Sequence, residues 1–227
     1  MKQSKGKGGK GFYLLVAVVV AVGGFMVLNA GGGDDLGDLS PAAIPVSDMS
    51  ADASAGTSIG TDEAPAVIME FSDYLCPHCR QFNSLSGKLL RQNHAAPGGD
   101  LRWVSFDFPL WPESWAPAIA AQCAKRQGKY WEMKDLLFAR VDSWRTESNP
   151  NRKFIDYATD LGLDSGSFKA CVDGQETLAD VQATRAYGES LGVNSTPTLF
   201  FNGARVTQGM DYASLEERIQ TVGADGD

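Results

Sequence analysis

The feature that most constrains this chain is the tetrapeptide Cys76-Pro77-His78-Cys79. Residues 66–71 before it form an apolar run with the length of a buried strand, and residues 77–91 have the spacing of a helix. The two cysteines therefore lie at a strand-to-helix turn. Thiols at this spacing can exchange a disulfide with a partner, so we interpret the tetrapeptide as a redox site.

A zinc site is the alternative for two cysteines at this spacing. Structural zinc takes four ligands, so two more residues would be needed. The chain has two histidines, and the one outside the tetrapeptide, His94, falls at the end of the predicted helix. We therefore expect no metal at Cys76 and Cys79.

The first thirty residues differ from the rest of the chain. Residues 1–11 contain four lysines and no acid, and residues 12–30 contain no charged side chain. Spanning a bilayer takes about 20 apolar residues, whereas the core of a signal peptide has about 7 to 15. We therefore expect residues 12–30 to be an uncleaved transmembrane anchor and residues 1–11 a basic tail in the cytoplasm. Cleavage after Ala30 is the alternative.

Residues 31–61 are rich in Gly, Ala, Ser and Asp and have almost no large apolar side chains. Such a segment cannot bury enough surface to fold, so we expect a flexible linker. Residues 62–222 then form a folded domain outside the cytoplasmic (inner) membrane, in the periplasm or an equivalent extracytoplasmic space. The net charge of −8 excludes nucleic acid as the expected partner.

The folded domain has a definite order of predicted elements. Asn202-Gly203 favours the positive φ angles of a tight hairpin between two strands. The order resembles an α/β thioredoxin fold with a helical insertion at about residues 112–191. The patterns predict strands at residues 66–71, 100–106, 198–201 and 204–207, and helices at residues 77–91, 114–127, 129–140, 151–161, 165–172, 175–191 and 212–222.

Two segments of the sequence also resemble one family. Residues 67–79, which end with the tetrapeptide, and residues 192–198 resemble the DsbA-like thiol:disulfide oxidoreductases. The resemblance covers about residues 60–222. It implies that Cys76 is the exposed nucleophile, that Cys79 closes a redox-active disulfide with it, and that no other cofactor is needed.

Helix geometry independently indicates the same nucleophile, because a thiolate in the first turn faces unpaired amides and the positive end of the helix dipole. Such settings lower a cysteine pKa from about 8.5 to between about 3.5 and 7.5, and the lower limit of this range is the value of a DsbA protein. We expect His78 to add a donor or a positive charge beside the Cys76 thiolate, and an ordinary exposed histidine is the alternative. Pro77 suits the first helical position and limits the amide donors there.

Glu70 interrupts the apolar strand before the cysteines. The resemblance places a buried acid here, near the second cysteine. Burial raises the pKa of a carboxyl group, which could then transfer a proton to or from Cys79. A solvent-facing Glu70 on an irregular strand is the alternative. We interpret Asp73 as a turn residue, with a contribution to the local electric field as its alternative.

Thr196-Pro197 resembles the cis-proline loop that faces the cysteines in this fold. Cis bonds are uncommon even before proline, at about 5 to 6 per cent, so the expectation rests on the resemblance and on the position before the hairpin. Ser195, Thr196 and Pro197 are the expected substrate-binding residues, because their backbone could add a strand to an extended client segment.

Cys123 and Cys171 lie on two predicted helices of the insertion. A bridge between them would close a loop of about 50 residues, which the chain-entropy model values at about 4 kcal/mol. In an oxidising compartment we favour this structural disulfide, and two buried free thiols are the alternative. The sequence does not establish the pairing.

These features predict a membrane-tethered disulfide oxidase that donates its disulfide to reduced, unfolded exported proteins. The resemblance implies reoxidation by a quinone-linked membrane partner. A reductase or isomerase of the same fold is the alternative, because related oxidases often carry valine where this chain has Thr196. A client-binding module with a purely structural CxxC is a third hypothesis. We expect a monomer, since residues 31–61 are too polar to form a dimerisation domain.

Overall fold

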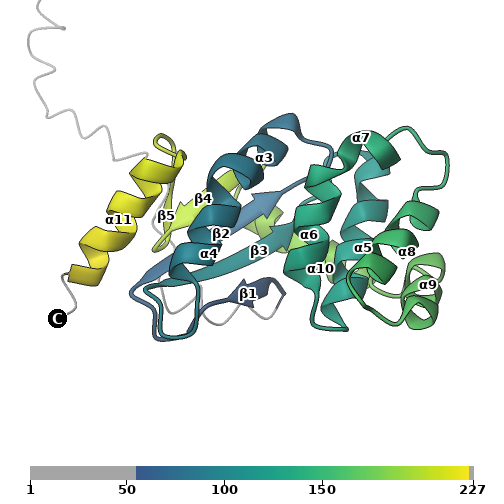
Figure 1. Cartoon of the computed structure of the whole chain (residues 1–227). Helices are drawn as coiled ribbons and strands as arrows, with labels where there is room; N and C mark the ends of the chain where they lie inside the picture. Colours follow the sequence, from purple (N-terminus) through teal and green to yellow (C-terminus); the bar gives the residue numbers. More distant parts are fainter. Residues whose placement is uncertain (1–54, 225–227) are drawn as a thin grey trace, which may run out of the picture. The chain divides into compact units, whose positions relative to one another are not determined.

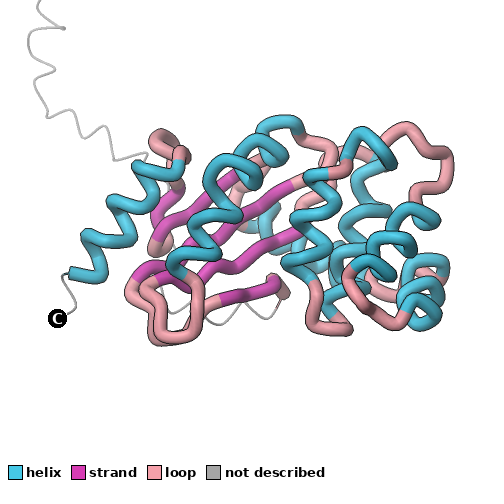
Figure 2. The backbone as a smooth tube through the Cα atoms, viewed as in Figure 1, coloured by secondary structure: helices cyan, strands magenta, loops and turns pink. Residues whose placement is uncertain are grey.

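The structure, a computed structural model, describes residues 55–224 of the 227-residue chain. A twisted sheet occupies one part of this domain, and helices pack on the sheet and continue beyond it into an all-helical region (Figures 1 and 2). Residues 1–54 contain the expected tail, anchor and most of the linker, and these predictions lie outside the described residues. Among residues 55–224, no helix combines the length and the apolar character needed to cross a bilayer.

The sheet has five strands in the order β1-β3-β2-β4-β5. β2 and β3 are parallel, and the other three pairings are antiparallel. The central strand β2 is buried along its whole length, which accounts for its nearly continuous apolar sequence. The strands are β1 Thr57–Ile59, β2 Ala66–Ser72, β3 Leu101–Asp107, β4 Thr198–Phe201 and β5 Ala204–Arg205.

Helices occupy the crossover from β2 to β3, the insertion between β3 and β4, and the C-terminal end. They are α3 Pro77–Phe82, a π-helical segment Asn83–Gly87, α4 Lys88–His94, a 3₁₀ turn Pro112–Ser114, α5 Trp115–Lys125, α6 Tyr130–Ala139, α7 Val141–Trp144, α8 Asn151–Asp160, α9 Ser165–Asp173, α10 Leu178–Ser190 and α11 Tyr212–Ala224. The predicted α/β fold with a helical insertion is confirmed. The single helix expected at residues 77–91 is divided by the π-helical segment, and α7 was not expected.

Alternate side chains of β2 pack into two different cores. Ala66 and Ile68 face the layer of α3, α4 and α11, whereas Val67, Met69 and Phe71 face the layer of α10. This alternation follows from the twofold repeat of a strand that is covered on both faces. The end of β2 is thereby fixed from both sides where it leads into the cysteine turn.

The turn between β4 and β5 has the predicted residues. Asn202 and Gly203 have φ angles of 44° and 85°, as a two-residue hairpin turn of this kind requires. The Asn202 side chain accepts a hydrogen bond from the Val67 amide at 2.7 Å and donates one to the Pro65 carbonyl at 3.0 Å. The hairpin therefore also holds the beginning of β2.

The strand β1 lies within residues 31–61, the segment expected to be a flexible linker. Thr57–Ile59 pair with β3 as an edge strand, so the folded domain begins earlier than residue 62. Two carbonyl groups of this segment accept hydrogen bonds from the insertion: Lys125 Nζ donates to Gly56 at 2.9 Å and Trp131 Nε1 to Ser58 at 3.4 Å. Side chains from distant helices thus satisfy polar groups of the edge strand, and a three-residue strand has no periodicity that would have predicted it.

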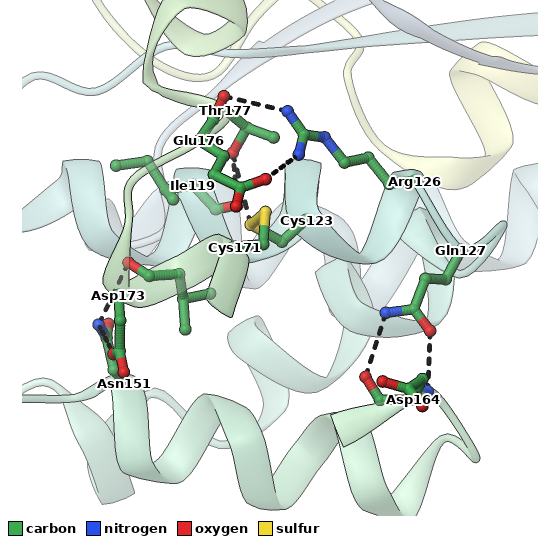
Figure 3. Close-up of a disulfide and its surroundings, with 11 residues drawn as sticks. Ile119, Cys123, Arg126, Gln127, Asn151, Asp164, Cys171, Asp173, Glu176 and Thr177 are labelled. Atoms are coloured by element: carbon green, nitrogen blue, oxygen red, sulfur yellow. Dashed lines mark hydrogen bonds and ion pairs between the residues drawn. A yellow bond between two sulfur atoms is a disulfide. The ribbon is translucent and has the colours of Figure 1, made fainter. Parts of the chain in front are cut away.

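A disulfide joins Cys123 of α5 to Cys171 of α9 within the insertion (Figure 3). The two Cα atoms are 5.9 Å apart, and the cysteines are separated by 48 positions in the sequence. Beside the disulfide, Arg126 forms an ion pair with Glu176. The predicted structural disulfide is confirmed, and the alternative of two free thiols is wrong.

Candidate active site

The thiols of the tetrapeptide lie at the beginning of α3. Cys76 is the N-cap residue, and Pro77 is the first residue of the helix, as its missing N–H allows. Cys76 is 5% exposed, and Cys79, one turn later, is completely buried at 0%. Both are free thiols in the structure. Of the two, Cys76 is the sulfur that a client can reach.

The surroundings of Cys76 favour its ionised form. The pKa of Cys76 is lowered to about 5, first by a hydrogen bond from the Cys79 thiol, and further by the Thr196 side chain and the backbone amides of Cys79 and His78. Burial opposes these donors and is outweighed. The direction is the one predicted from the helix N-terminus, where unpaired amides face the sulfur.

Cys79 has the opposite property. Burial raises the pKa of its thiol well above the ordinary value, and the neighbouring Cys76 thiolate adds to the effect. Two sulfurs three positions apart therefore favour different protonation states. At neutral pH the reduced pair consists of one thiolate at Cys76 and one thiol at Cys79, which titrate as a coupled pair.

The loop before β4 faces this pair. The Thr196-Pro197 peptide bond is cis, as the resemblance implied. When Cys76 is protonated, its thiol donates a hydrogen bond to the Thr196 carbonyl, 3.2 Å from the sulfur. Behind the loop, Arg205 of β5 donates to the Thr198 hydroxyl at 3.2 Å. The structure thus brings together two sites that are 120 positions apart in the sequence.

Ser195 and His78 are exposed beside the cysteines. The Ser195 carbonyl accepts a hydrogen bond from the Thr198 hydroxyl at 2.8 Å, so this loop is held from within. The backbone amide of His78 is one of the donors to Cys76. Contact of Ser195 with a client, and a role for the His78 ring, stay predictions.

An apolar groove of about 550 Å³ lies beside the cysteines. One wall belongs to α3 and the π-helical segment, and the other to the cis-proline loop and the beginning of α11. Leu85 on the first wall is 61% exposed, so its apolar side chain is available to a molecule that enters the groove. The side chains that line the groove include His78, Phe82, Leu85, Pro197, Met210 and Tyr212.

Glu70 is buried, as the resemblance implied, but its charge state differs from the expected one. Its Oε2 accepts hydrogen bonds from Lys134 Nζ and Trp103 Nε1, both at 3.0 Å. Burial by itself would raise the pKa of Glu70, but the charges of Lys134 and Arg91 and these two hydrogen bonds lower it further than burial raises it. The expected raised pKa was wrong, and so was the solvent-facing alternative. Proton transfer to Cys79 stays a prediction.

Sequence reasoning missed Lys134, which is 0% exposed. Besides Glu70, it donates to the Ser72 and Ser105 hydroxyls at 3.2 and 2.6 Å. Helical spacing could have revealed it, because Lys134 lies four positions after the buried Tyr130 and so shares its face of α6.

Asp107 at the end of β3 is a second buried acid that sequence reasoning missed. Its carboxylate accepts hydrogen bonds from Tyr74 and Tyr130, both at 3.0 Å, and from Gln122 at 2.6 Å. Burial raises the pKa of Asp107, and these donors with the charge of Lys134 counteract the rise. The signal available was its position, since an acid directly after a buried strand lies at the same sheet edge as the cysteine turn.

A family model described as thioredoxin matches residues 52–221, about three quarters of the chain. Among curated relatives, the chain is 34% identical over 166 residues to a Na⁺/H⁺ antiporter NhaA 1 of Mycobacterium sp. strain KMS, and 29% identical over 156 residues to the NhaA antiporter of Herminiimonas arsenicoxydans. These alignments cover 71% and 69% of this chain but only 26% and 24% of the relatives. The chain thus spans about a quarter of the length of the curated relatives it matches.

Solved structures have the same fold at low sequence identity. Oxidised BdbD from Bacillus subtilis superposes with a TM-score of 0.63 at 20% identity, covering 74% of this chain and 93% of BdbD. Wolbachia pipientis α-DsbA1 gives a TM-score of 0.65 at 17% identity, covering 75% and 92%. A thioredoxin-like oxidoreductase from Silicibacter pomeroyi gives 0.58 at 24% identity, covering 75% and 93%. The chain belongs to the thioredoxin family, and its domain has the DsbA-like form of that fold.

Proposed function

We propose that the protein is an extracytoplasmic thiol:disulfide oxidoreductase that donates the Cys76–Cys79 disulfide to exported proteins. The observation that carries this proposal is the opposite pKa shift of the two thiols, to about 5 at Cys76 and well above 9 at Cys79. A stabilised thiolate stabilises the reduced protein relative to the disulfide. The oxidised pair therefore tends to accept electrons from a client.

The proposed cycle has two exchange steps. A client thiolate attacks Cys76, a client–Cys76 disulfide forms, and Cys79 leaves and takes up a proton. A second client thiolate then attacks the client sulfur and displaces Cys76, which leaves as a stable thiolate. The client loses two electrons and gains a disulfide, and the enzyme pair gains those two electrons. The nucleophilic attack is at Cys76 because Cys79 is inaccessible.

Client recognition in this proposal uses the groove and the cis-proline loop. An extended client segment would bring its cysteine to Cys76 and its apolar side chains to Leu85 and Met210. Backbone groups of Ser195 and Thr196 would add hydrogen bonds that do not depend on the client sequence. This arrangement would accept many unfolded proteins.

We further propose that residues 12–30 anchor the domain in the cytoplasmic membrane, with residues 31–54 as a tether. Support comes from the four lysines before an uncharged segment. Reoxidation by a quinone-linked membrane partner is the corresponding proposal for the return of the disulfide.

A reductase or isomerase is the second candidate function. Thr196 before the cis-proline favours it, because its side-chain hydroxyl interacts with the two thiols at a position where related oxidases often carry valine. One structure of the same fold, from Novosphingobium aromaticivorans, is described as a protein-disulfide isomerase, at 18% identity with a TM-score of 0.61. The direction of electron flow separates the two functions.

The reduction potential of the Cys76–Cys79 pair, measured in glutathione buffers, tests the proposal. We expect a value well above the potential of thioredoxin, which is about −270 mV, and a value near −270 mV would contradict the oxidase function. Cys76→Ser should abolish oxidation of a reduced model client. In Cys79→Ser, the Cys76 thiolate should attack the disulfide of an oxidised model client and release one client sulfur as a thiolate. The mixed disulfide should accumulate because no second active-site thiol is present to resolve it, which identifies Cys76 as the reacting sulfur.

A further inference from the structure

Asp73 directly follows β2 and lies three positions before Cys76. It is a buried acid that the proposed cycle does not use. It is 1% exposed. Its Oδ1 accepts hydrogen bonds from the Leu75 amide at 2.7 Å and the Ser114 hydroxyl at 2.8 Å, and its Oδ2 accepts one from the Leu110 amide at 2.6 Å. All three of these hydrogen bonds are donated to the carboxyl oxygens, so they favour the ionised form of Asp73.

These hydrogen bonds connect two loops at the same edge of the sheet. Leu75 directly precedes Cys76, and the Cys76 amide donates to the Asp73 carbonyl at 3.1 Å. Leu110 and Ser114 belong to the loop that leaves β3 and enters α5. Asp73 is therefore the side chain that holds the turn of the nucleophile against the beginning of the insertion.

The loop after β3 is itself fixed. The Thr184 hydroxyl of α10 donates to the Asp107 carbonyl at 2.7 Å, and Arg185 donates to the Pro109 carbonyl at 2.8 Å. The Phe108 amide donates to the Ser72 carbonyl at 2.9 Å. Asp73 thus ties the cysteine turn to a rigid support and not to a mobile loop.

Glu70 is paired with the cation Lys134, whereas Asp73 has no such partner within the described part of the chain. Among residues 55–224, no lysine, arginine or histidine forms an ion pair with Asp73. Burial raises the pKa of Asp73, the three donors counteract this rise, and the Cys76 thiolate raises the pKa further. The interaction between two negative charges is mutual, so Asp73 disfavours the Cys76 thiolate.

We propose that Asp73 is a positioning residue of the redox site, which holds the Cys76 turn against the loop after β3. In addition, its buried negative charge limits how strongly the cysteine pair oxidises its clients. The inference rests on the proposed function. A negative charge beside the thiolate destabilises the reduced pair, so the charge shifts the equilibrium toward the disulfide. The site then contains hydrogen-bond donors that favour the Cys76 thiolate and one acid, Asp73, that disfavours it.

Asp73→Asn tests the charge, because the amide keeps the size of the side chain and its oxygen keeps the acceptor for Leu75 and Ser114. Only the hydrogen bond from the Leu110 amide to Oδ2 is lost with the charge. We expect the equilibrium with glutathione to move on the order of tenfold toward the reduced protein, about 30 mV for a two-electron couple. The midpoint of the Cys76 thiolate absorbance should move to lower pH. An unchanged or more reducing potential in a folded variant would overturn the proposal.

Two further variants separate charge from position. Ser114→Ala removes one hydrogen bond and keeps the charge, so it should lower thermal stability while leaving the potential within a threefold change in the equilibrium. Asp164→Asn is the matched control, because Asp164 also accepts a backbone hydrogen bond, from the Ser167 amide at 2.6 Å, at the start of α9. A shift in Ser114→Ala or Asp164→Asn as large as in Asp73→Asn would contradict the role of the charge.

A measurement on the unmodified protein covers the case in which Asp73→Asn does not fold. Carbon-13 NMR of labelled aspartate side chains can follow the Asp73 carboxyl from pH 3 to pH 8 in both redox states. We expect its apparent pKa to be higher in the reduced protein, where Cys76 is a thiolate, than in the disulfide form. Equal values would overturn the inference. A wild-type protein that fails to oxidise clients but shows this difference would contradict the proposed function alone.

Discussion

Gly188 of α10 occupies a position with no room for a larger side chain. A Cβ atom there would lie 2.7 Å from Phe108 and 2.8 Å from Phe71. Interiors packed at the density of organic crystals do not open at low cost. We therefore expect Gly188→Ala to lower the free energy of unfolding by about 1 to 3 kcal/mol in a urea titration, although alanine is the better helix former.

Gly223 of α11 provides the matched control, since a Cβ atom there would have nothing within 4 Å. Gly223→Ala should leave the unfolding free energy unchanged or raise it by up to about 1 kcal/mol. If Gly188→Ala were as stable as the wild type, the two phenylalanine rings would have to move apart without loss, contrary to our expectation.

The properties of single residues were predictable where their causes are local. The largest cause of the low pKa of Cys76 is Cys79, one turn later, and amides at the beginning of its own helix add to it; both are visible in the sequence. The Thr196 side chain, which also lowers this pKa, is distant in the sequence. The pKa of Glu70 depends on Lys134, which lies 64 positions away. No local pattern pairs these two residues, so the burial of Glu70 could be expected but its charge state could not.

At the scale of elements, Lys134 of α6 connects the insertion to the central strand. The Lys134–Glu70 pair is completely buried on both sides. Removing one partner of such a pair leaves an uncompensated charge, which costs about 3 to 5 kcal/mol. We expect Lys134→Met to lower the unfolding free energy at pH 7 by this amount, measured in urea.

The pH dependence of this variant identifies the cause. Without Lys134, the folded pKa of Glu70 should rise above its unfolded value of about 4.3. The penalty is then present at pH 7 and decreases as the pH falls toward 4 and Glu70 becomes protonated. The double variant Glu70→Gln, Lys134→Met should recover part of the stability at pH 7. A deficit that is the same at pH 4 and pH 7 would assign the loss to packing.

The disulfide between α5 and α9 gives a second prediction at this scale. It closes a loop across 48 positions, and the chain-entropy model values such a loop at about 4 kcal/mol. Cys123→Ala with Cys171→Ala should lower the unfolding free energy by up to this amount. The potential of Cys76 and Cys79 should stay the same, and a large change in it would show that the two disulfides are coupled.

Elements were predictable when their sequence carries a repeating pattern or a specific turn. The hairpin at Asn202-Gly203 and the helices of the insertion were expected within a few residues of their observed bounds. β1 has three residues and is completed by Lys125 and Trp131 from other elements. The π-helical segment Asn83–Gly87 was missed for a related reason, because its extra residue does not change the apolar spacing enough to be seen.

For the whole molecule, the insertion and the sheet share their polar core. Lys134 of α6 binds β2 and β3, and Gln122 of α5 binds Asp107 at the end of β3. The order of elements, which is local information, was sufficient to predict the fold class. The contacts that join the two parts involve pairs far apart in the sequence, and these could not be predicted.

The two active-site thiols also affect the stability of the whole domain when reduced. Cys76 has a folded pKa of about 5 against about 8.5 in an unfolded chain. Between these values the unfolded state binds a proton that the folded state has released, so stability rises with pH. Above about 8.5 the unfolded Cys79 thiol ionises, whereas burial keeps the folded one protonated, so stability then falls.

We therefore expect the unfolding free energy of the reduced protein to rise from pH 5 to a maximum near pH 8.5 and to decrease at higher pH. The reduced Cys76→Ser variant should lack the rise and keep the decrease, because it retains only the Cys79 contribution. Urea midpoints of both proteins in the same excess of reductant provide the measurement, and taking their difference cancels the effect of reductant on Cys123–Cys171. Parallel pH profiles would contradict the lowered pKa of Cys76, and with it the basis of the proposed oxidising power.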